Sequence, residues 1–354
     1  MEPLEFEMFA HEILSRLPSK CVGRFKSVCK QWRYKLSSSI FSIIHSRRMY
    51  NSEHRKLITL TASSIYIDNL IGGKVDICER KFISFPVDTP LSNLTILAAQ
   101  YGLLLMCIQG PSDQLILWNP TTNKFLNLCH NKPKSFFDIK ATAVGIYLDS
   151  FNDVKILHLQ RRMDDVVPRV YSMNTHEWKT LTFLKGSNYA SLLYLWSNGT
   201  LCNNVLYFAS PHYWAPPKSY MIAFDVVSET FSKLSIAQFT HVVARQRCFF
   251  KIRNILHMFV VVKTNDINVK LFKFEAQGLL EVSSFTNPKS ISFELWLNKL
   301  GEKGAQSWYF ITDWGIIIEI KIDMKDLQYL QDAETFQGLY NVASFKETVL
   351  SPTL

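Results

Sequence analysis

The feature that most constrains this sequence is a pair of apolar segments that recurs about every 50 residues beyond residue 57. Each copy has an alternating apolar segment, a polar turn, and a second segment that ends near Leu or Phe. Alternation of apolar and polar residues at a period of two is typical of β-strands. The copies cover residues 74–85, 116–128, 169–181, 221–234, 270–282 and 317–330.

The spacing of these copies predicts an all-β propeller with six blades. The turn residues of successive copies are 43 to 55 residues apart, and a further short apolar strand precedes most copies. Several strands per unit at this period are typical of propellers, in which radially packed meanders cover one another's faces. A β-sandwich or a pair of small barrels is the alternative. The predicted turn residues are Asp76, Asn119, Asn174, Asp225, Glu275 and Asp323.

The C-terminal segment also has strand character. We expect residues 338–350 to form a strand that closes the ring against the first blade. The overall fold class predicted for the chain is therefore α+β and multidomain, because the first 50 residues follow a different period.

Residues 1–50 repeat at helical spacing and predict three helices. The first has an apolar stripe through Phe9 and Leu17 and ends at Pro18, because the residue before a proline is disfavoured in the α region. A second helix begins at Ser19 and extends to Trp32, and a third follows residues 37–39. Three short helices cannot hide this apolar surface among themselves. They either dock on the larger domain or meet helices of a partner.

Composition excludes several classes of protein. Aromatic residues make up 13% of the chain, which favours β-structure, and the net charge of +9 includes no run of five or six like charges. We therefore interpret the charge as thinly spread and expect no nucleic-acid partner. The longest strongly apolar run, residues 255–262, is far too short to cross a bilayer, so no membrane partner is expected either.

The cysteines and the N-terminal residues predict a location in the cytoplasm or nucleus. The seven cysteines include no CxxC pair and lie mostly among apolar residues, as buried thiols do in reducing compartments. The first ten residues are acidic and lack the order of a secretory signal.

No motif predicts catalysis. The sequence contains no HExxH, GxGxxG, P-loop or GxSxG pattern, and no His/Cys cluster at metal-ligand spacing. We therefore expect no catalytic residue, no metal site and no cofactor.

The first helical region resembles the F-box, the helical module that docks a Skp-type adaptor in cullin–RING ubiquitin ligases. The resemblance rests on "EILSRLP", "RFKSVCKQWR" and "SSSIFSIIHSRR", and the phrase "LWNPTTNKF" resembles the F-box-associated, kelch-like domain of plant F-box proteins. The resemblance implies an F-box at residues 1–50, a linker at 51–56 and the propeller at 57–354. The implied adaptor-binding residues are Ile13, Leu14, Leu17, Pro18, Val22, Phe25, Val28, Cys29 and Trp32.

This resemblance implies a non-catalytic substrate-recognition subunit of a Skp–cullin–F-box ligase, with the adaptor linking it to cullin and the propeller binding an unidentified target protein. One departure from the family pattern is that Glu5-Phe6 stand where Leu-Pro is usual. The alternative is therefore a propeller that binds protein or glycan outside a ligase, with a degenerate F-box. The predicted target-binding residues lie on loops between the second and third strands of blades: Arg161, Arg162, His212, Tyr213 and Trp214.

Overall fold

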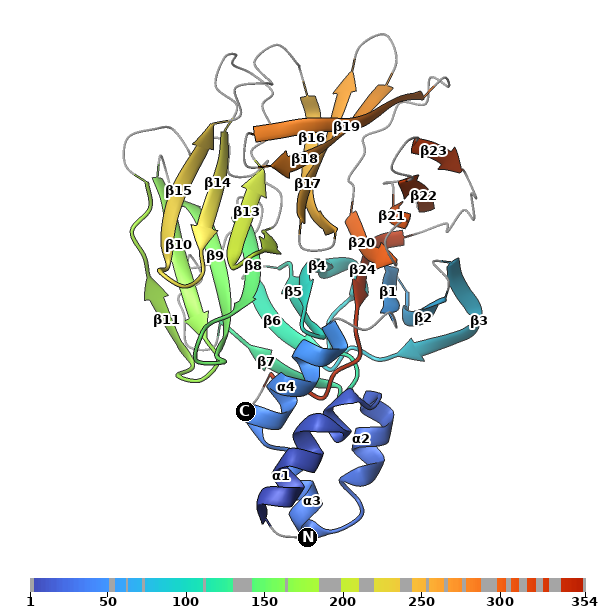
Figure 1. Cartoon of the computed structure of the whole chain (residues 1–354), viewed down its shortest axis with the longest axis vertical. Coiled ribbons are helices and arrows are strands. Elements are labelled where there is room, and N and C mark those ends of the chain that lie inside the picture. Colours follow the sequence, from blue (N-terminus) through green and yellow to red (C-terminus); the bar gives the residue numbers. More distant parts are fainter. Residues whose placement is uncertain are drawn as a thin grey trace. The chain divides into compact units, whose positions relative to one another are not determined.

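The computed structural model describes most of the chain. The described residues are 3–50, 55–61, 63–71, 74–110, 113–129, 142–162, 165–184, 199–209, 220–235, 244–252, 255–263, 267–275, 278–287, 298–303, 307–311, 317–322, 327–330 and 339–352. They form two compact units, residues 1–133 with 338–354 and residues 134–337 (Figure 1). The helices all belong to the first unit.

The N-terminal region of the described residues contains four α-helices and one 3₁₀ turn, so the prediction of three helices was wrong. The elements are α1 (Pro3–Glu12), η1 (Leu14–Arg16), α2 (Ser19–Phe25), α3 (Lys30–Leu36) and α4 (Ser39–Tyr50). The single helix predicted from Ser19 to Trp32 is broken after Phe25. There the backbone tightens into i→i−3 hydrogen bonds, such as Val28 N to Phe25 O at 3.2 Å, and Cys29 is extended at φ −158°.

The first unit also holds two four-stranded antiparallel sheets. One has the order β24-β1-β2-β3 and the other the order β4-β5-β6-β7. The strands are β1 (Arg55–Thr61), β2 (Ile65–Ile71), β3 (Lys74–Ile83), β4 (Leu94–Gln100), β5 (Leu103–Ile108), β6 (Gln114–Asn119), β7 (Lys124–Asn127) and β24 (Leu339–Phe345), with a 3₁₀ turn η2 (Leu91–Asn93) before β4.

The second unit holds four further antiparallel sheets, each of four strands in chain order or its reverse. Their strands are β8 (Thr142–Leu148), β9 (Val154–Arg162), β10 (Asp165–Ser172), β11 (Glu177–Thr180), β12 (Thr200–Cys202), β13 (Val205–Ala209), β14 (Tyr220–Asp225), β15 (Thr230–Ser235), β16 (Ala244–Ile252), β17 (Ile255–Lys263), β18 (Ile267–Glu275), β19 (Gly278–Asn287), β20 (Asn298–Lys303), β21 (Ser307–Ile311), β22 (Ile317–Ile322) and β23 (Leu327–Leu330).

Neighbouring sheets pack face to face through apolar side chains, as blades of a β-propeller do. In the first unit, Ile58 and Ile67 of one sheet share a core with Met106 and Trp118 of the other. In the second unit, β8–β11 pack on β12–β15 so closely that a Cβ added at Gly145 would lie 2.8 Å from a Leu206 methyl. The predicted order of an N-terminal helical region followed by four-stranded, propeller-like sheets is therefore confirmed.

The repeat pattern located most hairpins correctly. Asn119, Asn174, Asp225 and Glu275 each lie where the third strand of a sheet turns into the fourth. Asp323 lies outside the described residues. The first copy was placed wrongly: residues 74–83 form the single strand β3, and the hairpin precedes it, because Ile71 pairs with Lys74.

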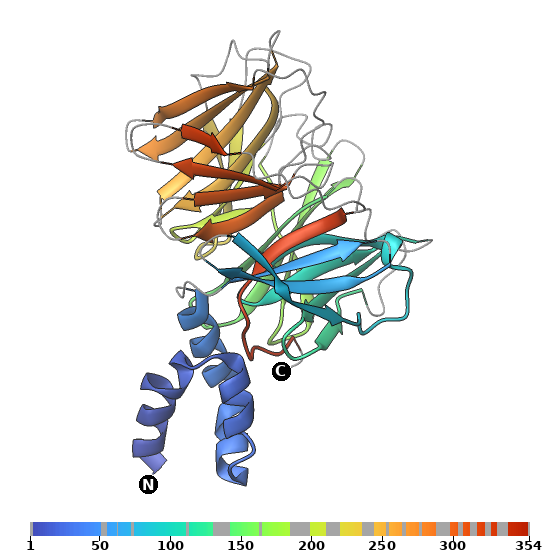
Figure 2. The same ribbon diagram turned by 90° about the vertical axis from the view of Figure 1, so that its right-hand side faces the viewer.

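The C-terminal strand joins the first sheet, as predicted. β24 pairs antiparallel with β1, from Lys56 opposite Phe345 to Thr61 opposite Leu339. In Figure 2, β24 (red) lies alongside β1 (blue), although almost 300 residues separate them in the chain. This sheet is therefore built from both ends of the described chain.

Candidate functional site

The helices share one small apolar core. Two of the predicted adaptor-binding residues belong to it, Leu14 with 2% and Val22 with 0% of its surface exposed. Three more, Leu17, Phe25 and Trp32, are half-buried and pack against this core. The ring centroids of Phe25 and Trp32 are 5.5 Å apart. These five residues hold the helices together in this conformation.

One buried member of this core comes from the far end of the chain. Val349 is 7% exposed and belongs to the same cluster as Ala10, Leu36 and Phe41. The sequence left open whether the larger domain or a partner protein covers the apolar surface of the helices. In the structure, part of that surface is covered by the chain's own residues after β24, which we call the C-terminal strap (residues 346–352).

Hydrogen bonds fix the strap to the sheet β4–β7. The buried Asn119 side chain donates from Nδ2 to the carbonyl oxygens of Thr348 at 3.1 Å and Leu350 at 2.6 Å. Thr348 Oγ1 in turn donates to the Tyr101 carbonyl at 3.0 Å. Gly102, at φ +79°, leaves space for this contact, because a Cβ there would overlap the Thr348 side chain. The strap therefore links the helices to a propeller sheet.

Helix α4 is tied to the other helices by polar contacts. His45 is fully buried, and its Nε2 lies 2.9 Å from the Leu17 carbonyl oxygen. Burial lowers the pKa of this imidazole, although the Leu17 contact acts against the shift. Arg48 also reaches Glu12, at 3.1 Å between guanidinium and carboxylate, and this hydrogen bond is the main reason that the pKa of Glu12 is lowered.

The remaining predicted adaptor-binding residues are on the surface. Ile13 is 51% exposed and Val28 61% exposed, and both Pro18 and Cys29 are exposed. Large apolar side chains that sequence reasoning missed are exposed beside them in the helical region: Met8, Tyr34 and Ile40. Tyr34 and Ile40 interrupt the apolar spacing of their helices, which is the signal that could have identified them.

The net charge is concentrated in the segment from η1 to α4, so the interpretation of a thinly spread charge was wrong. Residues 13–52 contain nine Lys or Arg and no Asp or Glu, which equals the net charge of the whole chain. The remaining 30 basic residues are balanced by 30 acidic ones. The pattern was missed because the basic residues are dispersed over positions 16–48 rather than placed in a run. Lys20 and Arg24 of α2, and Lys30 and Arg33 of α3, are three or four residues apart, so each pair shares a helix face.

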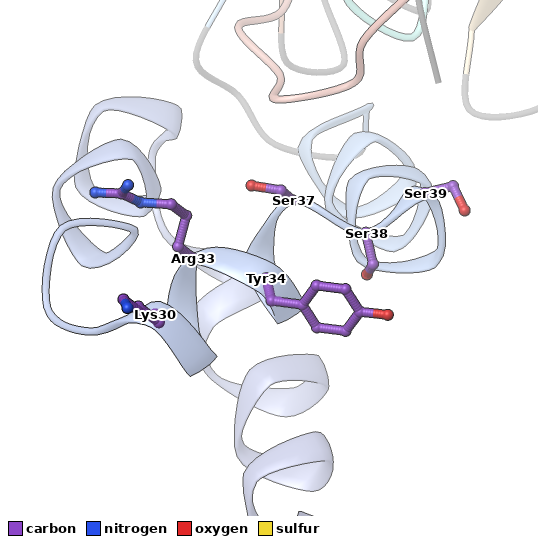
Figure 3. A pocket seen from close by; sticks show the side chains of 6 residues that line it. All are labelled: Lys30, Arg33, Tyr34, Ser37, Ser38 and Ser39. Atoms are coloured by element: carbon purple, nitrogen blue, oxygen red, sulfur yellow. The ribbon is translucent and has the colours of Figure 1, made fainter.

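An open cavity of about 560 Å³ lies in this basic region. It is lined by α3 and the start of α4, with the side chains of Lys30, Arg33 and Tyr34 beside Ser37, Ser38 and Ser39 (Figure 3). Ser38 caps α4, because its Oγ accepts a hydrogen bond from Phe41 N at 3.2 Å. The arrangement offers two cations, a ring and hydroxyls to a ligand, which suits recognition of carboxylates.

The predicted target-binding residues divide into two groups. Arg161 and Arg162 are not in a loop, because β9 extends through both and pairs them with Val166 and Asp165 of β10. The loop between these strands is shorter than the apolar pattern suggested. His212, Tyr213 and Trp214 lie outside the described residues.

Two tryptophans lie next to the hairpins that join the third and fourth strands of their sheets, Trp118 on β6 and Trp178 on β11. Trp118 is fully buried, and its Nε1 donates to Asn123 Oδ1 at 3.2 Å. Trp178 is half-buried, with its ring centroid 5.2 Å from that of Tyr171. Trp118 belongs to the core between two sheets, whereas the Trp178 ring packs on Tyr171 of the neighbouring strand in its own sheet.

Searches for other kinds of site gave no candidate. Within the described parts of the chain, no group of three or more His, Cys, Asp or Glu side chains could hold a metal ion. Among those same residues, no helix has the length and apolar character needed to span a membrane.

Two family models match the chain. The F-box domain matches residues 10–43, and the F-box associated beta propeller domain matches residues 90–336, which is more than half of the chain. The chain belongs to the F-box-associated β-propeller family. It is a plant-type F-box protein, with the F-box helices at its N-terminal end and the propeller domain after them.

Relatives in Arabidopsis thaliana agree with this family. One F-box protein is 28% identical over 70% of this chain and 63% of its own length. An F-box/kelch-repeat protein is 27% identical over 65% of each chain. This F-box protein therefore spans slightly less than two thirds of the length of both relatives.

A solved structure shares the fold. A Bacteroides uniformis protein, provisionally assigned as a 6-phosphogluconolactonase, superimposes with a TM-score of 0.51. It is 10% identical over 83% of this chain and all of its own. At this identity the likeness concerns the fold alone.

Proposed function

We propose that this F-box protein is the substrate-recognition subunit of a Skp–cullin–F-box ubiquitin ligase. The helices dock a Skp-type adaptor, which links the protein to cullin. The propeller domain binds a target protein for ubiquitylation, in the cytoplasm or nucleus. The chain contributes binding rather than catalysis, and the covalent steps belong to other subunits.

The observation that carries this proposal is the exposure of large apolar side chains on helices that match the F-box model. Ile13 and Val28 lie within the matched residues 10–43 and are both more than half exposed. A soluble protein gains nothing from exposing such side chains on its own, whereas a docking interface uses them as anchors. Val28 lies at the break between α2 and α3, where the backbone turns its side chain to solvent.

The test is binding of the full chain to a purified plant Skp adaptor. We expect the double variant Ile13→Glu/Val28→Glu to lose binding by 100-fold or more, or about 2.8 kcal/mol in total, because it puts two charges into an apolar interface. Leu14→Asp would be a poor probe. Leu14 is buried in the helical core, so this substitution would unfold the helices and abolish binding for a trivial reason.

Val227→Glu supplies a matched control. Val227 is 65% exposed, close to the 61% of Val28, but it lies on the hairpin between β14 and β15. The Val227→Glu variant should bind the adaptor with the affinity of the parent chain. Equal binding by the parent and the Ile13→Glu/Val28→Glu variant would reject this docking surface.

A second candidate function rests on the Glu5-Phe6 pair of α1. If the parent chain is folded yet does not bind the adaptor, the F-box has lost its docking function. The propeller would then act as a protein- or glycan-binding module outside a ligase. Restoring adaptor binding with Glu5→Leu/Phe6→Pro would attribute that loss to this pair.

A further inference from the structure

The basic helices carry an electrostatic feature that an apolar docking site does not require. All the net positive charge of the chain lies in residues 13–52, and six of the nine cations there are exposed: Arg16, Lys20, Arg24, Lys30, Arg33 and Arg47. Glu12 pairs with Arg16 and Arg48. Within the described residues, Lys20, Arg24, Lys30 and Arg33 make no ion pair with a carboxylate.

Concentrated charge of this kind has a cost that binding can offset. Like charges at helical spacing repel one another, which destabilises the free helices by a few tenths of a kcal/mol per pair. Repulsion between cations also acts at Lys26. Burial is the main cause of its lowered pKa, and repulsion from Lys124 of β7 lowers the pKa further. An acidic partner would relieve this repulsion.

The cavity at α3 concentrates the charge at one place. Lys30 and Arg33 lie one helical turn apart and line it together with the 78%-exposed ring of Tyr34 (Figure 3). Lys and Arg side chains bind carboxylates, and a planar guanidinium can take one in bidentate fashion. Exposed apolar groups at Val28 and Tyr34 flank these cations, a mixture that suits a folded protein surface better than a phosphate backbone.

We propose that the cavity lined by Lys30, Arg33 and Tyr34 receives an acidic segment of the adaptor, so that Asp or Glu side chains of the partner pair with these two cations. This inference rests on the proposed function and adds the chemistry of the partner. The apolar residues Ile13 and Val28 supply affinity. The basic surface attracts the acidic partner at long range and so raises the association rate.

The test compares two variants with the same charge change. The first, Lys30→Glu/Arg33→Glu, reverses the cavity. The second, Lys81→Glu/Lys233→Glu, reverses two exposed lysines on β3 and β15. Both full-length proteins are mixed with purified plant Skp adaptor, and the association rate is measured between about 20 mM and 500 mM salt, where screening rises strongly.

We expect the parent chain and the β3/β15 variant to associate fast at low salt and more slowly as salt rises. The cavity variant should associate about tenfold or more slowly at low salt and depend little on salt. Its dissociation rate should change less than that of Ile13→Glu/Val28→Glu. Unfolding in urea verifies that each variant is folded.

The outcomes separate the two proposals. If the adaptor binds the parent chain but the cavity variant keeps the parent rate and salt dependence, the acidic-segment inference is wrong and the ligase function stands. If the folded parent does not bind the adaptor, both are wrong. Vesicles containing phosphatidylserine and a single-stranded RNA are parallel probes. Binding of either that depends on Lys30 and Arg33, with no effect on the adaptor, assigns the surface to that ligand and overturns the inference.

Discussion

The helices and the propeller sheets differ in how completely they bury large apolar side chains. The sheets bury several of their largest side chains completely, among them Trp118, Tyr147 and Phe224, and the charges outside residues 13–52 balance. The helices have one small core, need Val349 from the other end of the chain to fill it, and leave Tyr34 and other apolar side chains exposed. The sheets thus have large buried cores, whereas the small core of the helices depends on a residue from the other end of the chain.

The largest expected effect compares one tryptophan from each region. Trp118 is fully buried and meets Phe85 edge to face, with ring centroids 5.2 Å apart, whereas Trp32 is half-buried between Phe9 and Phe25. Trp118→Ala should lower the free energy of unfolding by about 3–5 kcal/mol, because it leaves a large cavity. Trp32→Ala should cost less than half as much. Urea denaturation of each variant measures both losses.

Equal losses for the two variants would contradict this contrast, since they would mean that the helical core is as well packed as the sheets. Adaptor binding sharpens the comparison further. Trp118→Ala should retain the adaptor affinity of any folded molecules, whereas Trp32→Ala should lower it by disturbing the helices that present Val28.

The sequence predicted the sheets better than the helices, for a physical reason. A period of two and a polar hairpin residue are local properties, so Asn119, Asn174 and Asp225 marked hairpins correctly. The hairpin before β3 was missed because the alternating pattern of residues 74–83 continues through a polar segment that resembles a turn. Its true signal was the Gly72-Gly73 pair in the sequence.

The candidate site was predicted only in part, because apolar spacing does not distinguish a core residue from an exposed anchor. Leu14 and Val28 both fit the predicted apolar faces, yet one is buried and the other exposed. That difference depends on the break after Phe25 and on Val349, which no local pattern in the helices could reveal. The basic surface needed a count of charges by region rather than a search for runs.

The next effect, smaller than that of Trp118, tests whether the strap supports the helices. Asn119→Ala removes two hydrogen bonds to strap carbonyls, at 3.1 Å and 2.6 Å. Leaving a buried carbonyl oxygen without its hydrogen bond costs about 1–3 kcal/mol. We expect faster hydrogen exchange in α1–α4 and in the strap, with β8–β19 unchanged, measured by mass spectrometry.

Asn127→Ala is the matched control for the strap. Asn127 Nδ2 also donates a hydrogen bond, but to Gln114 Oε1 within the sheet β4–β7, at 3.0 Å. This variant should leave exchange in the helices as it is in the parent chain. If hydrogen exchange in α1–α4 is equally slow in both variants, the strap does not stabilise the helices, and the Val349 contact contributes nothing to their stability.

The smallest expected effect is a pH dependence confined to the helices. Burial lowers the pKa of His45 below its usual value of 6.5, so the folded helices bind a proton less readily than the unfolded chain does. The stability that the neutral imidazole contributes is therefore complete above about pH 6.5 and is lost as the pH falls through its lowered folded-state value.

Exchange in α4 and η1 should accelerate from pH 7 to pH 5, after correction for the intrinsic rate. His45→Gln keeps a polar side chain near the Leu17 carbonyl but does not titrate, so it should abolish this acceleration while lowering protection at pH 7. If the acceleration persists in His45→Gln, it arises elsewhere.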